Sequence, residues 1–220
     1  MPDDVDRLSA SFASSFALLA AVDTFRFLDP GPLIDGELEL VAPDARWVED
    51  VLAACNHPLT LRDAPAESKV TRQKLLDFLA GAPGGRQSAE PAKGYLPQYN
   101  FWLRLHEQPG RSAPVRIAGG IGLRIGTTDS IALYYGHIGY HVYPPARGRH
   151  YAERACRLLL PLCRRHGLRT LWITCNPDNR ASRRTCERLG MEMVGTVPIP
   201  EGDPLYVRGD REKCRYRLIL

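Results

Sequence analysis

The sequence predicts an α/β fold with a mixed, mostly antiparallel sheet flanked by helices. Apolar residues alternate along some stretches, as in strands, and recur at helical spacing along others, as in amphipathic helices. Two short turn-rich joints, EQPGRSAP and GTTDS, separate three consecutive strand candidates and favour antiparallel neighbours. The expected order of elements is β-α-α-β-β-β-α-β-α-β-β.

The first part of the chain is expected to be mainly helices and loops. Apolar residues at helical spacing predict a short amphipathic helix over residues 9–22, and the prolines and glycines of 30–36 mark a loop. The elements expected next are a strand over 37–43, a helix over 45–55, a helix over 67–79 and a loop-like stretch over 80–94. We divide the chain into an N-terminal arm, residues 1–36, and a domain, residues 37–220.

The rest of the chain alternates between strands and helices. Strands are expected over 99–106, 115–125 and 131–143, then a helix over 148–166, a strand over 168–175, a helix over 180–189 and strands over 191–197 and 213–220. Gly167 and Gly190 follow the two helices, at the position where glycine commonly ends a helix. Pro161 lies inside the longer helix and removes one hydrogen bond, so we expect a kink there.

Length and composition are typical of one globular domain. The chain has 220 residues, of which 44% are hydrophobic, enough to bury one sizeable core. The first residues, MPDDVDR, are acidic where a secretory signal would be basic, and the apolar stretch Phe16 to Val22 is too short to span a bilayer. We therefore expect a cytoplasmic protein.

The cysteine pattern indicates neither a metal site nor a disulfide framework. The six cysteines form no C-x-x-C pair and have no histidine at ligand spacing. Cysteine is among the residues most often buried in protein cores. We therefore expect buried, reduced thiols and no bound metal.

The positive charge is concentrated in one segment. The net charge is only +4, yet the segment 147–188 holds eleven arginines and three carboxylates. Such a bias suits an anionic ligand, and both coenzyme A and nucleic acid fit that description. For Arg154, Arg157, Arg164 and Arg165 a solvated helix face is the simpler interpretation.

A basic turn in this segment is suited to phosphate. The alternating strand Ile138, Tyr140, Val142 is stopped by two prolines, and a turn containing Gly148 then opens the long helix. The unpaired backbone N–H groups at a helix start form an anion site. The arginines on either side of Gly148 add cationic side chains, so the turn can bind a diphosphate.

Three short motifs follow one another in this region: RGRHYA from Arg147, NRAS from Asn179, and Gly190-Met191. With these motifs the region resembles the acetyl-CoA-binding half of the GNAT superfamily of N-acetyltransferases. The family's diphosphate loop follows the pattern [QR]-x-x-G-x-[GA], and an N-x-x-[SA] helix ending in a Gly-aromatic pair follows about thirty residues later. The chain departs from the pattern at His150, where the loop normally has glycine, and at Met191, where an aromatic residue is common.

The resemblance implies that acetyl-CoA is the co-substrate. The strand before the loop would contact the pantetheine arm through backbone N–H and C=O groups of Tyr140 and Val142. The residues implied for the diphosphate are Arg147, Gly148, Arg149, His150, Tyr151 and Ala152. Ser182 and Asn179 belong to the second motif; the Asn179 amide would contact pantetheine, and a helix N-cap is the alternative role.

The resemblance also suggests catalytic residues, with alternatives for each. The family's base is usually some ten residues before the loop, where this chain has His137, although strand alternation places its side chain opposite the slot most often used. His141 is expected on the same face of the strand as His137 and is a second candidate for the base. Many members use a tyrosine seven residues after the asparagine as the general acid. This chain has Cys186 there, for which a small core-facing residue is the simpler interpretation, so either the thiolate leaves unassisted or another group such as Tyr206 protonates it.

We therefore expect an N-acetyltransferase that moves an acetyl group from acetyl-CoA to a primary amine by direct attack in a ternary complex. The acceptor would be a small molecule or a peptide, bound near residues 95–100 and a hairpin over 201–210. A homodimer is possible through the N-terminal helix. The alternatives are a non-catalytic CoA-binding or sensor module on the same fold and, less favoured because no nucleic-acid motif is present, a nucleic-acid-binding protein.

Overall fold

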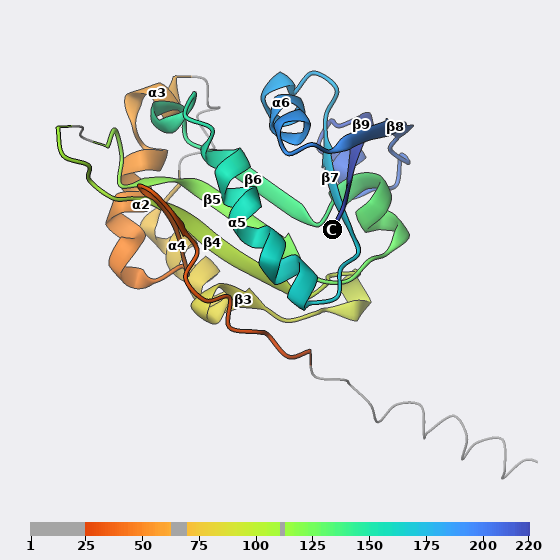
Figure 1. Cartoon of the computed structure of the whole chain (residues 1–220), viewed down its shortest axis with the longest axis horizontal. Coiled ribbons are helices and arrows are strands. Elements are labelled where there is room, and N and C mark those ends of the chain that lie inside the picture. The colour runs from red at the N-terminus through yellow and green to blue at the C-terminus, as the bar shows by residue number, and fades with distance from the viewer. Residues whose placement is uncertain (1–24, 63–69, 111–112) are drawn as a thin grey trace, which may run out of the picture.

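The computed structural model describes residues 25–62, 70–110 and 113–220, and its α/β architecture confirms the predicted fold class (Figure 1). The helix expected over 9–22 and the beginning of the one expected over 67–79 lie outside the described residues. None of the described helices is long and apolar enough to cross a bilayer.

The strands form two antiparallel sheets. The six-stranded sheet has the order β1-β2-β4-β5-β6, with β3 paired to β4, and the three-stranded sheet has the order β7-β9-β8. The strands of the first sheet are β1 (Ile34–Asp35), β2 (Leu38–Val41), β3 (Arg86–Gln87), β4 (Gln98–Leu105), β5 (Ile117–Arg124) and β6 (Ile138–Val142). The strands of the second are β7 (Thr170–Cys175), β8 (Glu192–Pro198) and β9 (Glu212–Ile219).

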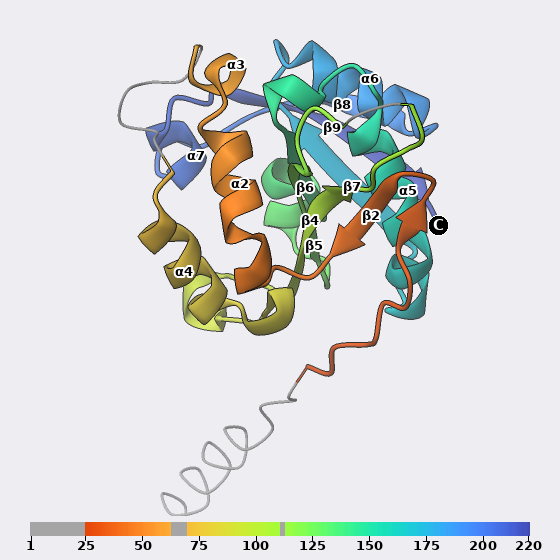
Figure 2. The ribbon, with the colours of Figure 1, turned by 90° about the vertical axis from the view of Figure 1, so that its left-hand side faces the viewer.

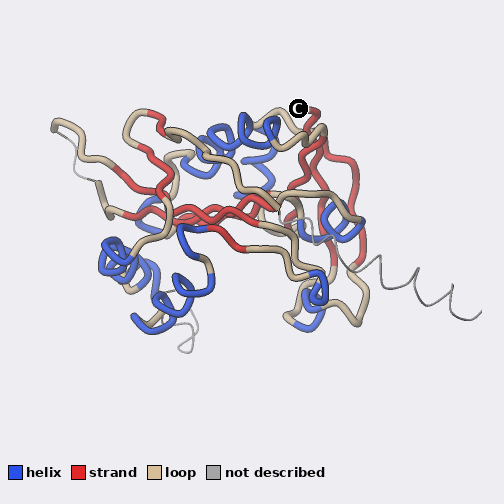
Figure 3. The backbone as a smooth tube through the Cα atoms, turned by 90° about the horizontal axis from the view of Figure 1, so that it is seen from below, coloured by secondary structure: helices blue, strands red, loops and turns tan. Residues whose placement is uncertain are grey.

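Helices cover both faces of the larger sheet. Helices α2 (Val48–Cys55) and α4 (Arg72–Gly81) lie on one face and α5 (Tyr151–Arg165) lies on the other (Figures 2 and 3). The remaining helices are α3 (Pro58–Leu61), α6 (Arg180–Arg188) and α7 (Pro204–Val207). Helix α5 continues through Pro161, whose ring is on the exposed side of the helix.

Strand alternation divides the core between these helices. On β4, Tyr99, Phe101 and Leu103 pack into the cluster that contains the buried face of α5. Trp102 points to the other face and packs with Val51 of α2. The α5 side receives the larger cluster, so α5 and the loop before it are fixed on the sheet by the main core.

The segment before β1 belongs to the packed body. Phe25, Phe27 and Leu28, which were predicted to belong to an N-terminal arm, pack against the core, and the Leu28 N–H donates to Tyr99 Oη at 2.6 Å. The apolar side chains were the available signal, but no local pattern says which surface such residues cover.

Three local predictions need correction. Residues Ile131–Tyr135 form a π turn rather than the start of the strand, which begins at Ile138. The hairpin expected over 201–210 contains helix α7, because Asp203 caps its start by accepting from the Leu205 N–H. The stretch expected to be loop over 80–94 includes β3 and two short 3₁₀ turns.

The two sheets meet at β6 and β7, which run side by side only at their starts. The His137 N–H donates to Trp172 O at 2.7 Å, and the Trp172 N–H donates back to His137 Nδ1 at 3.0 Å. Gly136 has φ of +65°, and a Cβ there would lie 3.0 Å from Trp172 O, so both conformation and space require glycine. Beyond this point β6 and β7 belong to separate sheets, which leaves one edge of β6 unpaired.

Candidate active site

A cleft of about 580 Å³ opens beside β6, between the start of α5 and α6. All ten residues predicted to bind the cofactor line it: Tyr140, Val142, Arg147, Gly148, Arg149, His150, Tyr151, Ala152, Asn179 and Ser182. They come from a strand, a loop and two helix starts, so folding has brought both motifs to one place.

The loop presents backbone N–H groups to this cleft. The first hydrogen bond of α5 runs from the Arg154 N–H to His150 O, so the N–H groups that precede Arg154 at the helix start have no intrahelical acceptor. Gly148 has φ of +82°, and nothing lies within 4 Å of the position of a Cβ. Open space beside backbone donors and arginines is the arrangement that a diphosphate requires.

His150 fits the loop by adopting the conformation that glycine normally supplies. Its φ is +58°, the only positive φ of a non-glycine residue in the described ranges. Its ring is exposed, and Nδ1 contacts the Arg188 guanidinium of α6. The ring is therefore turned toward α6 instead of filling the space beside Gly148.

We expect His150→Gly to stabilise the protein slightly. A non-glycine residue in the left-handed region costs about 1–2 kcal/mol, and glycine loses about 0.5–1 kcal/mol more through backbone entropy. The free energy of unfolding in urea should therefore rise by about 0.5–1 kcal/mol. A fall would mean that the contact with Arg188 outweighs the strain, and Arg188→Gln is the control that removes this contact while keeping His150.

The unpaired edge of β6 carries the backbone N–H and C=O groups of Tyr140 and Val142, which the resemblance implies for the pantetheine arm. The Tyr143 N–H donates to Ala118 O at 2.8 Å, and the Arg124 N–H donates to His137 O at 2.8 Å. Because backbone groups alternate in direction along an antiparallel strand, Tyr140 and Val142 direct theirs away from β5. The Val142 carbonyl accepts from Arg147 Nε at 3.1 Å, which ties the loop to the strand.

Side chains of the second motif hold α6 beside β6. Asn179 Oδ1 accepts from the Ser182 N–H at 3.0 Å, so the asparagine caps α6, as the alternative interpretation of its role predicts. The hydroxyls of Tyr140 and Ser182 lie 2.9 Å apart, and burial raises the pKa of Tyr140. This contact joins the strand to the helix across the cleft.

Two arginines of the basic segment form ion pairs with carboxylates. Arg154 binds Asp35 and Glu37, and Arg157 binds Glu153 of its own helix, so both are structural. Four residues of α6 that line the cleft were not among the predicted cofactor-binding residues: Ala181, Arg184, Thr185 and Arg188. Their spacing of three and four residues places them on one helix face, which is the signal that could have found them.

His137 lies outside the cleft, and its environment argues against the predicted role as base. It is 0% exposed, and Nδ1 accepts from the Trp172 N–H while Nε2 lies 3.2 Å from Thr127 Oγ1. Burial lowers the pKa of His137 from 6.5 to about 4. Both ring nitrogens are engaged, so we interpret His137 as the side chain that joins the two sheets.

The two predicted acids are also outside the cleft lining. Cys186 is 0% exposed, and burial raises the pKa of its thiol to about 12. Tyr206 lies on α7 under the Arg211 guanidinium, 4.0 Å from the ring centre, with its hydroxyl 3.5 Å from Glu201. Neither position favours proton donation to a leaving thiolate in this cleft.

His141, the second candidate base, does line the cleft. It lies on β6 on the sheet face opposite α5, and it is exposed. One side of its ring packs on Gly120, where a Cβ would lie 2.8 Å from Cε1, and on the Tyr143 ring, 5.1 Å away between centres. This partial burial lowers the pKa of His141, so its imidazole is neutral at pH 7 and can accept a proton.

The cleft and its motifs agree with the family comparison. The family model described as acetyltransferase (GNAT) domain matches residues 37–192, which include every residue that lines the cleft. The chain belongs to the GNAT acetyltransferase family. Within the described ranges of this GNAT protein, no group of three or more histidine, cysteine or carboxylate side chains is placed to hold a metal ion.

Solved structures of GNAT proteins share this fold at low sequence identity. The microcin C7 self-immunity acetyltransferase MccE, solved with acetyl-CoA and AMP, has a TM-score of 0.60 at 16% identity, covering 84% of this chain and 94% of that chain. RimL, the ribosomal L7/L12 α-N-protein acetyltransferase solved with CoA, has a TM-score of 0.59 at 17% identity, covering 86% and 98%. A putative ribosomal-protein-serine acetyltransferase from Vibrio cholerae has a TM-score of 0.58 at 16% identity, covering 88% and 100%. No curated protein sequence matches this chain.

Proposed function

We propose that this GNAT protein is an N-acetyltransferase that transfers the acetyl group of acetyl-CoA directly to a primary amine in a ternary complex. The observation that carries the proposal is the cleft itself, in which the basic loop, the α6 start and the free edge of β6 converge. Two of the structurally similar proteins, MccE and RimL, were solved with acetyl-CoA or CoA.

The residues present fit acetyl-CoA. The α5 start and Arg149 would hold the diphosphate, Tyr140 and Val142 would pair with pantetheine through their backbone, and Arg188 adds positive charge on the opposite wall. When bound, acetyl-CoA supplies a thioester as acyl donor. The chain's own contribution is to hold donor and amine in one place, which can account for much of the rate.

We assign the role of base to His141. Direct attack requires an unprotonated amine, and the amine loses a second proton as the new amide bond forms. A neutral imidazole that is exposed in the cleft can accept it, directly or through a water molecule.

Calorimetric titration with acetyl-CoA tests the cofactor site. We expect wild-type protein to bind, and Arg149→Gln to weaken binding about tenfold or more, because a hydrogen bond to a charged group contributes about 1.5–3 kcal/mol. Arg164→Gln is the matched control, since Arg164 is exposed on α5 outside the cleft. No heat of binding with the wild type, or equal effects of the two substitutions, would contradict the proposal.

A screen of amines, following release of the CoA thiol, distinguishes the enzyme from the second candidate function. That candidate is a CoA-binding or sensor module, and it is favoured by one observation: His137, Cys186 and Tyr206 all lie outside the cleft lining. Tight acetyl-CoA binding without acceleration of thiol release by any amine would support the module. Amine-dependent release with formation of the acetylated amine would support the transferase.

A further inference from the structure

A second, smaller cavity lies beside the loop that precedes α5. Its volume is about 250 Å³, and it is enclosed by Glu37 in the turn between β1 and β2, by the end of β4 with the connection that follows, and by Arg149 and Tyr151. Figure 2 shows this turn and this connection next to α5. Sites for drug-sized ligands measure about 300–1,000 Å³, so this cavity suits a smaller molecule.

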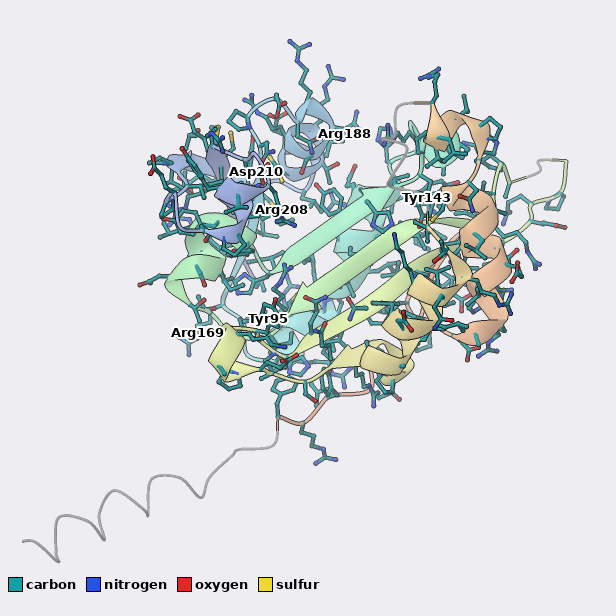
Figure 4. The ribbon with its side chains drawn as sticks, turned by 180° about the vertical axis from the view of Figure 1, so that it is seen from behind. Tyr95, Tyr143, Arg169, Arg188, Arg208 and Asp210 are labelled. Atoms are coloured by element: carbon teal, nitrogen blue, oxygen red, sulfur yellow. The ribbon has the colours of Figure 1, made fainter. Side chains whose placement is uncertain are left out.

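The smaller cavity and the main cleft share a wall. Arg149 and Tyr151 line both of them, whereas the other residues around the smaller cavity do not line the cleft. Tyr151 is 2% exposed and belongs to the main core, so its position is fixed. In Figure 4 Arg188 marks the α6 side of the cleft, and the connection from β4 to β5 extends from the sheet on the other side of Tyr143.

The charged groups around the smaller cavity have partners, with Arg149 as the exception among the described residues. Glu37 accepts from Arg154 Nη1 at 2.8 Å, and this bond lowers the pKa of Glu37 to about 2. His106 Nε2 lies 2.8 Å from Glu39 Oε2. The Arg149 guanidinium forms no hydrogen bond or ion pair with any described residue. An unpaired guanidinium beside a cavity favours an anionic ligand, and its N–H groups match the oxygens of a carboxylate or phosphate.

The remaining wall of the smaller cavity is mainly apolar. It consists of Leu105, Pro109 and Ala113 together with the amide side chain of Gln108. Apolar surface of this kind is favourably covered by the hydrocarbon part of a ligand. A cationic ligand would need a free carboxylate, and that of Glu37 is already bound by Arg154. The lining therefore matches an anion with a short apolar body.

We propose that the smaller cavity binds a small organic anion, a short-chain carboxylate or phosphate ester, whose charged group contacts Arg149. The guanidinium of Arg149 would then lie between this anion and the diphosphate of acetyl-CoA. Since two anions share one cation, each weakens the binding of the other, and by the same factor. The cavity binds its anion independently of acetyl transfer, and only the coupling rests on the acetyl-CoA site of the proposed function.

Saturation-transfer NMR titrations with butyrate and monobutyl phosphate test the cavity without acetyl-CoA. Butyramide has nearly the shape of butyrate but no charge, so it is the matched control. We expect at least one anion to bind about tenfold more tightly than butyramide, because a hydrogen bond between charged groups is stronger than one to a neutral group. The tighter-binding anion identifies the ligand as a carboxylate or a phosphate ester. No binding of either anion, or binding equal to that of butyramide, would overturn the proposal.

Two variants assign the binding to the smaller cavity, because neither position lines the cleft. Ala113→Leu fills part of the cavity, and Gln108→Glu adds a carboxylate that repels the anion, so each should weaken anion binding at least several-fold. Gln73→Glu makes the same change at an exposed position of α4, on the opposite face of the sheet, and should keep the wild-type affinity. Unchanged affinity in both cavity variants would contradict the assignment. Melting temperatures show whether each variant is folded.

Calorimetric titration with acetyl-CoA at increasing concentrations of the tighter-binding anion tests the coupling. With ionic strength held constant by chloride, the apparent Kd of acetyl-CoA should rise and then level off at about tenfold, comparable to the expected effect of Arg149→Gln. The plateau arises because both ligands still bind together. In Arg149→Gln the anion should have no effect. A rise in proportion to anion concentration, without a plateau, would mean displacement within the cleft and would contradict the coupling.

The two kinds of measurement separate this site from the proposed function. If acetyl-CoA does not bind, the proposed function fails, while NMR with the cavity variants still decides whether the anion site exists. If acetyl-CoA binds and amines are acetylated but neither anion binds, the anion site alone is excluded.

Discussion

Replacing His141 with glutamine is expected to lower kcat/KM for an accepted amine by about 100- to 10,000-fold, the range for loss of a general base. His141 lines the cleft and is exposed on the sheet face opposite α5. Glutamine retains a similar size and hydrogen-bonding capacity, so the acetyl-CoA affinity should stay close to that of the wild type. Initial rates of thiol release measure the effect.

The pH dependence of kcat/KM provides a second test of His141. In the wild type two groups must lose a proton, the amine and an imidazole whose pKa is below 6.5 because of its partial burial. Log kcat/KM should therefore rise with a slope of two at the acidic end and of one above the imidazole pKa. In His141→Gln the slope should be one throughout. His166→Gln, at the far end of α5, is the control, and identical profiles for wild type and His141→Gln would exclude His141 as the base.

The folded protein is expected to lose about 3 kcal/mol of stability between pH 6.5 and pH 4 because of His137. Burial lowers the pKa of His137 to about 4, whereas in the unfolded chain it is near 6.5. Below pH 6.5 the unfolded chain therefore binds a proton that the folded protein does not, and each pH unit favours unfolding by about 1.4 kcal/mol. The contribution is fully present above pH 6.5 and is lost as the pH falls to 4.

Urea unfolding at a series of pH values measures this loss. His137→Gln removes the titrating group, so its free energy of unfolding should vary less with pH by about 3 kcal/mol over the same window, although its stability at pH 7 will fall with the loss of the bond to the Trp172 N–H. Carboxylates with lowered pKa values, such as Glu37 at about 2, respond mainly below this window. Parallel pH profiles for wild type and variant would show that His137 is not neutral in the folded protein.

The order of helices and strands could be predicted from local patterns in the sequence. Helix α5 shows buried residues at helical spacing, and β7 alternates between buried and partly exposed residues, so their periodicity was visible without the structure. The π turn over Ile131–Tyr135 was not predictable in the same way, since its apolar residues fit a strand equally well. Its conformation is held by non-local bonds, such as that from Arg215 Nε to Ala132 O at 2.8 Å.

The residues of the candidate cofactor site could be predicted from the family resemblance because its motifs are local. The loop from Arg147 to Ala152 combines backbone N–H groups at a helix start with neighbouring arginines, and the α6 motif follows it at the interval that the resemblance implies. The candidate catalytic residues were less accessible to this reasoning. His137 and His141 are four residues apart and alternate onto the same side of the chain. His137 is buried and bonded to Trp172, 35 residues away, whereas His141 is exposed.

The α/β class and the GNAT motifs could be predicted from the sequence alone, because each depends on spacing along one helix, strand or turn, and the ten residues that the resemblance implies are among those that line the cleft. Only the tertiary structure decided which of the two candidate bases, His137 and His141, faces the cleft and which arginines are paired with carboxylates. Burial and ion pairing depend on which distant segments pack together, as β7 does against His137 and as Asp35 and Glu37 do with Arg154. Local spacing contains no information about such neighbours.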